Sequence, residues 1–67
     1  MRTEKTLLID ELHAQITATQ ERLVAATEAD DEYEVARQRA RLEDLIELAD
    51  RNGFDVDLWV DRSLLAN

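Results

Sequence analysis

The first 52 residues contain neither glycine nor proline, the two residue types that most strongly disfavour the interior of a helix. Apolar residues recur through this stretch with the spacing of one helical face, but the repeat changes phase once, near residues 28–34. The first stripe consists of Ile9, Leu12, Ile16, Thr19, Leu23 and Ala26. The second consists of Val35, Leu42, Leu45, Ile46 and Ala49.

A single uninterrupted helix does not fit this change of phase. Continuing the first register would place Asp30, Arg37 and Asp44 at successive buried positions, which a coiled coil does not tolerate. Two helices joined at the phase change would instead bury both stripes against each other. The sequence therefore predicts an all-α fold, an antiparallel two-helix hairpin, in a single domain covering residues 1–67.

The residues at the phase change are acidic, with five carboxylates within residues 28–34. Negative charge is unfavourable at the C-terminal end of one helix and favourable at the N-terminal end of the next. We therefore expect helix one over about residues 3–27, an acidic hinge over 28–32 and helix two over about 32–51. Asp31 followed by Glu34 has the spacing of a capping box, with Asp30 as the alternative cap.

The single glycine, Gly53, is placed to end helix two in a left-handed conformation. Beyond it, we expect a short C-terminal third helix over about residues 55–65. Asp55 would be its N-cap, and Phe54 would pack against Trp59.

The same C-terminal segment also fits a strand over residues 54–61, because apolar and acidic residues alternate there. A strand needs a partner strand, and only a second copy of the chain offers one. The short helix is the preferred prediction, and the intermolecular strand stays open as the alternative.

The small size of the chain favours association. A chain of 67 residues forms a core worth roughly 3–5 kcal/mol at best. Disulfides and structural zinc stabilise many small domains, but this chain has no cysteine and one histidine. A second copy or a partner protein is the remaining source of buried apolar area, so we expect a homo-oligomer or a subunit of a larger complex.

The formal net charge of −8 limits the classes of partner. Negative charge repels phosphate, which disfavours nucleic acid and anionic membrane surfaces. No apolar run is long enough for a transmembrane span or a signal-peptide core, so a cytoplasmic protein is expected.

The sequence contains no recognisable catalytic, cofactor-binding or metal-binding motif. His13 and Ser63 have no partners at the spacing of a hydrolase site, and carboxylate pairs such as Glu43 with Glu47 are common on solvated helix faces. We therefore expect no enzymatic activity, no cofactor and no metal.

The preferred functional hypothesis is a non-enzymatic, acidic protein-protein interaction module. It would self-associate through apolar helix surface left over when the hairpin closes, as an assembly or accessory subunit or as a regulatory adaptor. The residues expected to bind a partner lie on the two helices and in the C-terminal segment: Leu8, Leu12, Ile16, Leu23, Val35, Leu42, Leu45, Ile46, Leu48, Phe54 and Trp59.

Two alternatives belong to other functional classes. An acidic inhibitor would occupy a basic nucleic-acid-binding groove of a target protein, although the carboxylates gather at the hinge instead of tracing a phosphate-like line. In addition, residues 48–55 resemble the corner of a helix-turn-helix motif, which implies DNA binding. The following helix would present Asp57 and Asp61, whose charge opposes contact with DNA.

Overall fold

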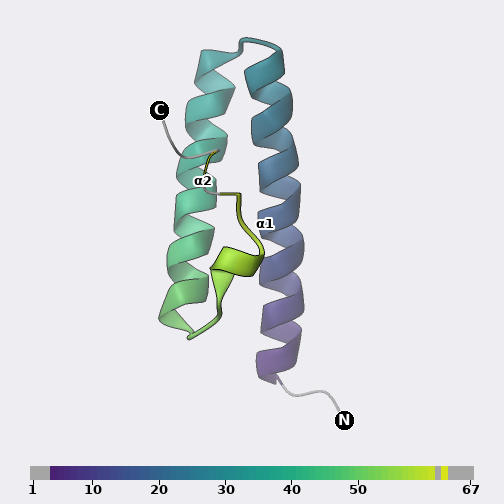
Figure 1. Ribbon diagram of the computed structural model, residues 1–67, viewed down its shortest axis with the longest axis vertical. Coiled ribbons are helices and arrows are strands. Elements are labelled where there is room, and N and C mark those ends of the chain that lie inside the picture. The colour runs from purple at the N-terminus through teal and green to yellow at the C-terminus, as the bar shows by residue number, and fades with distance from the viewer. Residues whose placement is uncertain (1–3, 62, 64–67) are drawn as a thin grey trace.

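The computed structural model of the chain describes residues 4–61 and 63, with side chains from residue 8 onward. Two long helices lie antiparallel, and a short segment runs back beside them (Figure 1). Helix α1 spans Glu4–Glu28, helix α2 spans Glu32–Arg51, and a 3-10 helix, η1, spans Val56–Leu58. The predicted all-α hairpin is confirmed, and no strand occurs in the described ranges.

Each helix contributes one buried stripe to a seam between them. On α1 the buried residues are Leu12, Ile16, Thr19, Leu23 and Ala26, and on α2 they are Gln38, Leu42, Leu45 and Ala49. Thr19 donates its hydroxyl to the Gln15 carbonyl at 2.7 Å, so this buried polar group is satisfied within its own helix. The core is therefore a narrow, mostly apolar seam along the hairpin.

The turn between α1 and α2 is a Schellman motif closed by an aspartate. Asp30 has a φ of 55°, in the left-handed region that favours glycine. Its N–H donates to the Thr27 carbonyl at 3.1 Å, and the Asp31 N–H donates to the Ala26 carbonyl at 3.0 Å. The Asp31 carboxylate then accepts the Glu34 N–H at 3.1 Å. The expected cap at Asp31 is confirmed, and Asp30 forms the turn instead.

Replacing Asp30 by glycine is expected to raise the free energy of unfolding by about 1 kcal/mol. A left-handed conformation costs a non-glycine residue about 1–2 kcal/mol, which glycine avoids. Glycine also has more conformational freedom in the unfolded chain, so part of this stabilisation is lost. Urea unfolding of Asp30→Gly and Asp30→Ala separates strain from charge, because alanine removes the carboxylate and keeps the strained Cβ atom. Equal gains in both variants would show that charge, and not backbone strain, limits this turn.

Helix α2 ends in a second Schellman motif, closed by Gly53, which has a φ of 79°. The Gly53 N–H donates to the Asp50 carbonyl at 3.0 Å, and the Phe54 N–H donates to the Ala49 carbonyl at 3.0 Å. Phe54 is buried in the same apolar cluster as Ala49. The predicted helix end at Gly53 is confirmed.

The segment after Gly53, residues 54–61, is called the tail below. The Asp55 carboxylate accepts the Asp57 N–H at 3.2 Å and caps η1, as predicted for this position. The longer helix expected over about residues 55–65 is wrong, because η1 ends at Leu58 and residues 60–61 are not helical. Residues 62, 64 and 65 of that prediction lie outside the described residues.

Gln20 of α1 explains why the helix stops. In a continuing α-helix, the Asp61 N–H would donate to the Asp57 carbonyl. It donates instead to Oε1 of Gln20 at 2.8 Å, while Nε2 of Gln20 donates to the Trp59 carbonyl at 2.7 Å. The backbone groups that would extend the helix are therefore held by the side chain of α1.

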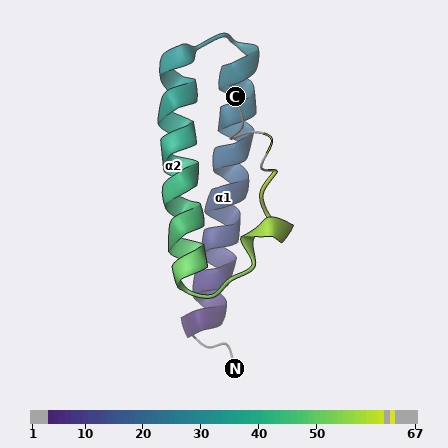
Figure 2. The ribbon, with the colours of Figure 1, turned by 60° about the vertical axis from the view of Figure 1, so that its left-hand side comes forward.

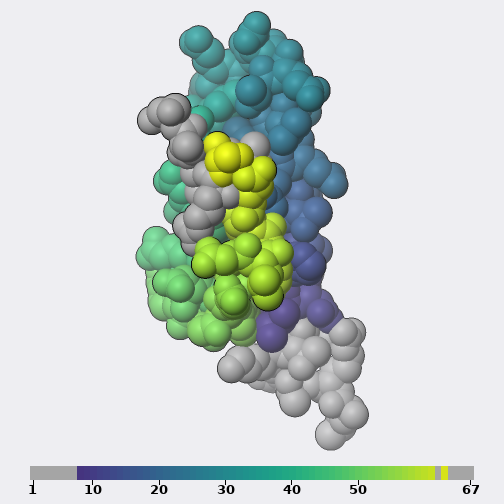
Figure 3. Space-filling model, viewed as in Figure 1, coloured from purple at the N-terminus to yellow at the C-terminus, as the bar shows by residue number. Residues whose placement is uncertain are grey.

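The tail covers one side of the hairpin. It leaves the lower end of α2 in Figure 1 and runs back along both helices, and the rotated view places it to one side of them (Figure 2). In the space-filling view the tail lies over the seam between α1 and α2 (Figure 3). The hairpin thus has one side covered by its own tail, called the tail side, and an opposite side called the open face.

Candidate functional site

The tail side is an internal interface. Phe54, Val56 and Val60 are buried in the same cluster as the seam residues. The His13 ring stacks on the Trp59 indole with centroids 5.0 Å apart and an interplanar angle of 23°. Trp59 also meets the Phe54 ring at a centroid distance of 6.2 Å, which confirms the expected contact between these two residues. Trp59 is therefore buried in part by atoms of its own chain.

The end of the tail is fixed by a local turn. The Ser63 hydroxyl and backbone N–H both donate to Oδ1 of Asp61, at 2.6 and 3.0 Å. The hydroxyl bond, with a smaller contribution from the backbone bond, lowers the pKa of Asp61 below its ordinary value. Both of these hydrogen bonds join Ser63 to Asp61, and the His13 ring stacks on Trp59 instead.

The open face carries a polar pair that connects the two helices. Nη2 of Arg41 donates to Oε1 of Gln15 at 3.2 Å, across the seam. Gln15 and Gln20 lie five residues apart, on opposite flanks of the buried stripe of α1. Because Gln20 holds the tail, Gln15 and Arg41 mark the side that the tail leaves uncovered.

Two exposed leucines share the open face with this pair. Leu8 precedes Gln15 by seven residues and Leu48 follows Arg41 by seven, so each lies two turns away on the same stripe. The exposed fraction is 36% for Leu8 and 40% for Leu48. Because α1 and α2 run in opposite directions, Leu8 and Leu48 both lie farther from the turn than Gln15 and Arg41 do. Leu8 and Leu48 are thus exposed apolar residues from different helices, both toward the end of the hairpin opposite the turn.

The structure divides the residues expected to bind a partner into two groups. Six are buried within the single chain: Leu12, Ile16, Leu23, Leu42, Leu45 and Phe54. Of the others, Leu8 and Leu48 are exposed, while Val35, Ile46 and Trp59 are half-buried against the core. In the closed hairpin, the first group belongs to the core, and the second group keeps some exposed surface.

Three further exposed apolar side chains lie outside the set of residues expected to bind a partner. Leu58 is 82% exposed on η1, and Tyr33 is 74% exposed at the start of α2. Val24 is also exposed, beside Gln20 on the tail flank of α1. These three residues are scattered over the surface, and single exposed apolar residues are common on monomeric proteins.

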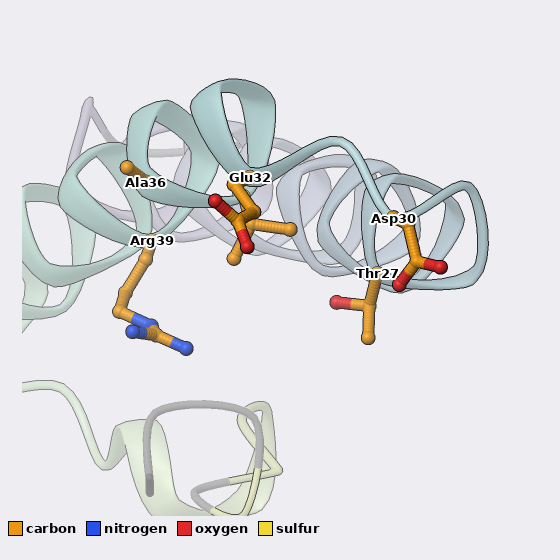
Figure 4. A pocket seen from close by; sticks show the side chains of 6 residues that line it. Thr27, Asp30, Glu32, Ala36 and Arg39 are labelled. Carbon is orange, nitrogen blue, oxygen red and sulfur yellow. The ribbon is translucent and has the colours of Figure 1, made fainter.

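A hollow of about 260 Å³ lies at the turn end of the hairpin (Figure 4). It is lined by Thr27, Asp30, Glu32, Val35, Ala36 and Arg39. The Thr27 hydroxyl donates to the Leu23 carbonyl at 2.9 Å, and no histidine or cysteine lines the hollow. Its charged lining residues are two carboxylates, Asp30 and Glu32, and one guanidinium, Arg39.

Two acidic residues near the turn, Asp31 and Glu34, take part in local structure. Asp31 caps α2, and the Glu34 carboxylate accepts hydrogen bonds from Nε2 of Gln38 at 2.6 Å and Nη1 of Arg37 at 3.4 Å. Over residues 4–61 and 63, no group of three or more histidine, cysteine or acidic side chains is arranged to hold a metal ion.

No described helix is long and apolar enough to cross a membrane. Comparison of the chain with protein-family models, curated proteins and solved structures gave no match. The functional argument therefore depends on the surfaces of the molecule itself.

Proposed function

We propose that the protein is a non-enzymatic protein-protein interaction module that self-associates through the open face. The observation that carries this proposal is the exposure of Leu8 and Leu48, from two helices, on the side that the tail leaves uncovered. Pairing two open faces shields both leucines of each copy, as the tail shields the apolar residues on its own side.

The strength of this association follows from the exposed area. Complete burial of one leucine contributes about 1.5–3 kcal/mol, and these side chains are already more than half buried. Two leucines from each of two copies therefore contribute about 2–4 kcal/mol, which by itself corresponds to an affinity no tighter than about millimolar. We propose weak, reversible self-association, of the kind that suits a subunit held in place by a larger assembly.

Leu48→Glu is expected to abolish concentration-dependent association, because it places a charge in the proposed interface of a chain that is already acidic. Sedimentation equilibrium over a wide range of concentrations measures the change. Leu58→Glu is the matched control, since Leu58 is more exposed than Leu48 and lies on η1. Loss of association in Leu58→Glu and not in Leu48→Glu would show that the interface lies on the tail side.

Salt separates this proposal from the acidic-inhibitor alternative. Two chains of formal charge −8 repel each other, so added salt strengthens association through an apolar face. An inhibitor that binds a basic groove would instead be released by salt. A chain that stays monomeric at every salt concentration, but binds a basic groove at low salt, would favour the inhibitor.

A further inference from the structure

The dipeptide Asn52-Gly53 joins α2 to the tail, and Asn52 is exposed. We propose that Asn52 is a site of spontaneous deamidation, that the cap of α2 controls the rate, and that the reaction releases the tail. Glycine after asparagine favours this chemistry because it has no Cβ atom to hinder the approach of its own backbone nitrogen. The substrate is the chain itself, and the co-reactant is water.

The reaction has two steps. The backbone nitrogen of Gly53 attacks Cγ of Asn52, forming an N–Cγ bond while the Cγ–Nδ2 bond breaks. The amide proton of Gly53 leaves with the side-chain nitrogen as ammonia, and a cyclic imide remains. Water then adds to either imide carbonyl and breaks its bond to nitrogen, which gives aspartate or isoaspartate at position 52.

The closed cap holds both reacting groups away from this path. The Gly53 N–H donates to the Asp50 carbonyl at 3.0 Å, and Nδ2 of Asn52 donates to the Leu48 carbonyl at 2.8 Å. The second bond turns the carboxamide back along α2, away from the nitrogen that must attack it. Ring closure therefore requires both bonds to break, which means that the cap must open locally.

Opening of the cap is coupled to the tail. The same Schellman motif includes the Phe54 N–H, which donates to the Ala49 carbonyl at 3.0 Å. From Phe54 the chain continues to Trp59 and Asp61, both held by the Gln20 side chain. Weakening the contact with Gln20 should therefore make cap opening more frequent.

The products cannot restore the cap. An ionised aspartate at position 52 has no proton to donate to the Leu48 carbonyl, and it adds negative charge at the C-terminal end of α2. Isoaspartate also lengthens the main chain by one atom, which displaces the Gly53 and Phe54 N–H groups from their acceptors. Deamidation therefore loosens the tail irreversibly and exposes the apolar residues of the seam that pack against Phe54 and Val60.

Mass spectrometry of the incubated full chain, with mapping of isoaspartate, tests the proposal. The reaction should be at least about tenfold slower in the folded chain than in a synthetic peptide of residues 48–57, since 1.4 kcal/mol of opening cost corresponds to a factor of ten. Gly53→Ala in the peptide should slow the reaction and confirm the chemistry. Equal rates in the folded chain and the peptide would overturn control by the cap.

Two further variants test whether opening of the α2 cap is coupled to the contact between Gln20 and the tail. Gln20→Ala should raise the rate severalfold by removing both hydrogen bonds to the tail. Gln15→Ala is the matched control, because Gln15 lies on the open face and its loss should leave the rate unchanged. If circular dichroism shows that Gln20→Ala is unfolded, Gln20→Glu serves instead, since it keeps the acceptor for the Asp61 N–H. Equal rates in the Gln20 and Gln15 variants would exclude the coupling.

Release of the tail is read from Trp59. In the purified deamidated chain, Trp59 fluorescence should shift to the red as the indole leaves the His13 ring and enters water. An unchanged emission spectrum in that form would overturn release of the tail.

Discussion

Replacing Leu42 by alanine is expected to leave the chain largely unfolded at ambient temperature. Leu42 has no exposed surface, and a buried leucine-to-alanine change costs about 2–5 kcal/mol. A single core in a chain of 67 residues supplies roughly 3–5 kcal/mol, so one substitution removes most of the available stability. Circular dichroism during urea titration measures the loss.

Leu58→Ala provides the control for this change. Leu58 is 82% exposed, and its truncation should alter the free energy of unfolding by less than about 0.5 kcal/mol. A small effect of Leu42→Ala would mean that the seam between α1 and α2 does not hold the hairpin together. A large effect of Leu58→Ala would mean that η1 is covered in solution, for example by a second copy.

Leu42 belongs to the part of the fold that the sequence predicts well. The two stripes, the cap at Asp31 and the stop at Gly53 are local signals, because each depends on residues within one or two helical turns. The observed helices, Glu4–Glu28 and Glu32–Arg51, accordingly lie close to the expected ranges. The antiparallel arrangement then follows from the short connection between them.

The tail could not be predicted in the same way. Val56 and Val60 are buried and Leu58 is exposed, as a single helical turn would place them, so the local pattern was informative. The end of η1 is decided by Gln20, 39 residues before Trp59, and no local rule identifies that contact. The path of the tail also decides which flank of the hairpin stays open, so helical spacing places Leu48 beside the stripe but does not show whether the tail covers it.

Gln38 was missed for a different reason. It lies between Val35 and Leu42 at the spacing of the seam, but its polarity kept it out of the predicted stripe. The residue is only 6% exposed, and its Oε1 atom is buried without a hydrogen-bond partner. Its Nε2 donates to Oε1 of Glu34 at 2.6 Å, which fixes the orientation of the amide. If the Gln38 amide were turned the other way, its Oε1 would face Oε1 of Glu34. The Gln38 carbonyl oxygen therefore points into the seam.

Gln38→Met is therefore expected to raise the free energy of unfolding by about 1–3 kcal/mol, the cost of a buried polar group that lacks a partner. Methionine keeps the unbranched shape of glutamine, so the seam need not repack. Glu34 loses one donor, but its side chain is partly exposed and still contacts Arg37. Urea unfolding measures the gain, and a loss of stability would show that the Gln38 carbonyl is hydrated in solution.

The same substitution tests what the buried amide does for the fold. A polar group at one seam position disfavours pairings that place it against another copy's apolar residues, a use of buried polar groups known from coiled coils. With methionine at position 38 the α2 stripe becomes wholly apolar from Val35 to Ala49, so intermolecular pairing of hairpins is expected to increase along with stability. Sedimentation of Gln38→Met with and without Leu48→Glu separates the two routes to association. Association that persists in the variant carrying both Gln38→Met and Leu48→Glu would come from pairing through the seam. If that double variant does not associate, Gln38 lowers the stability of the fold without restricting how hairpins pair.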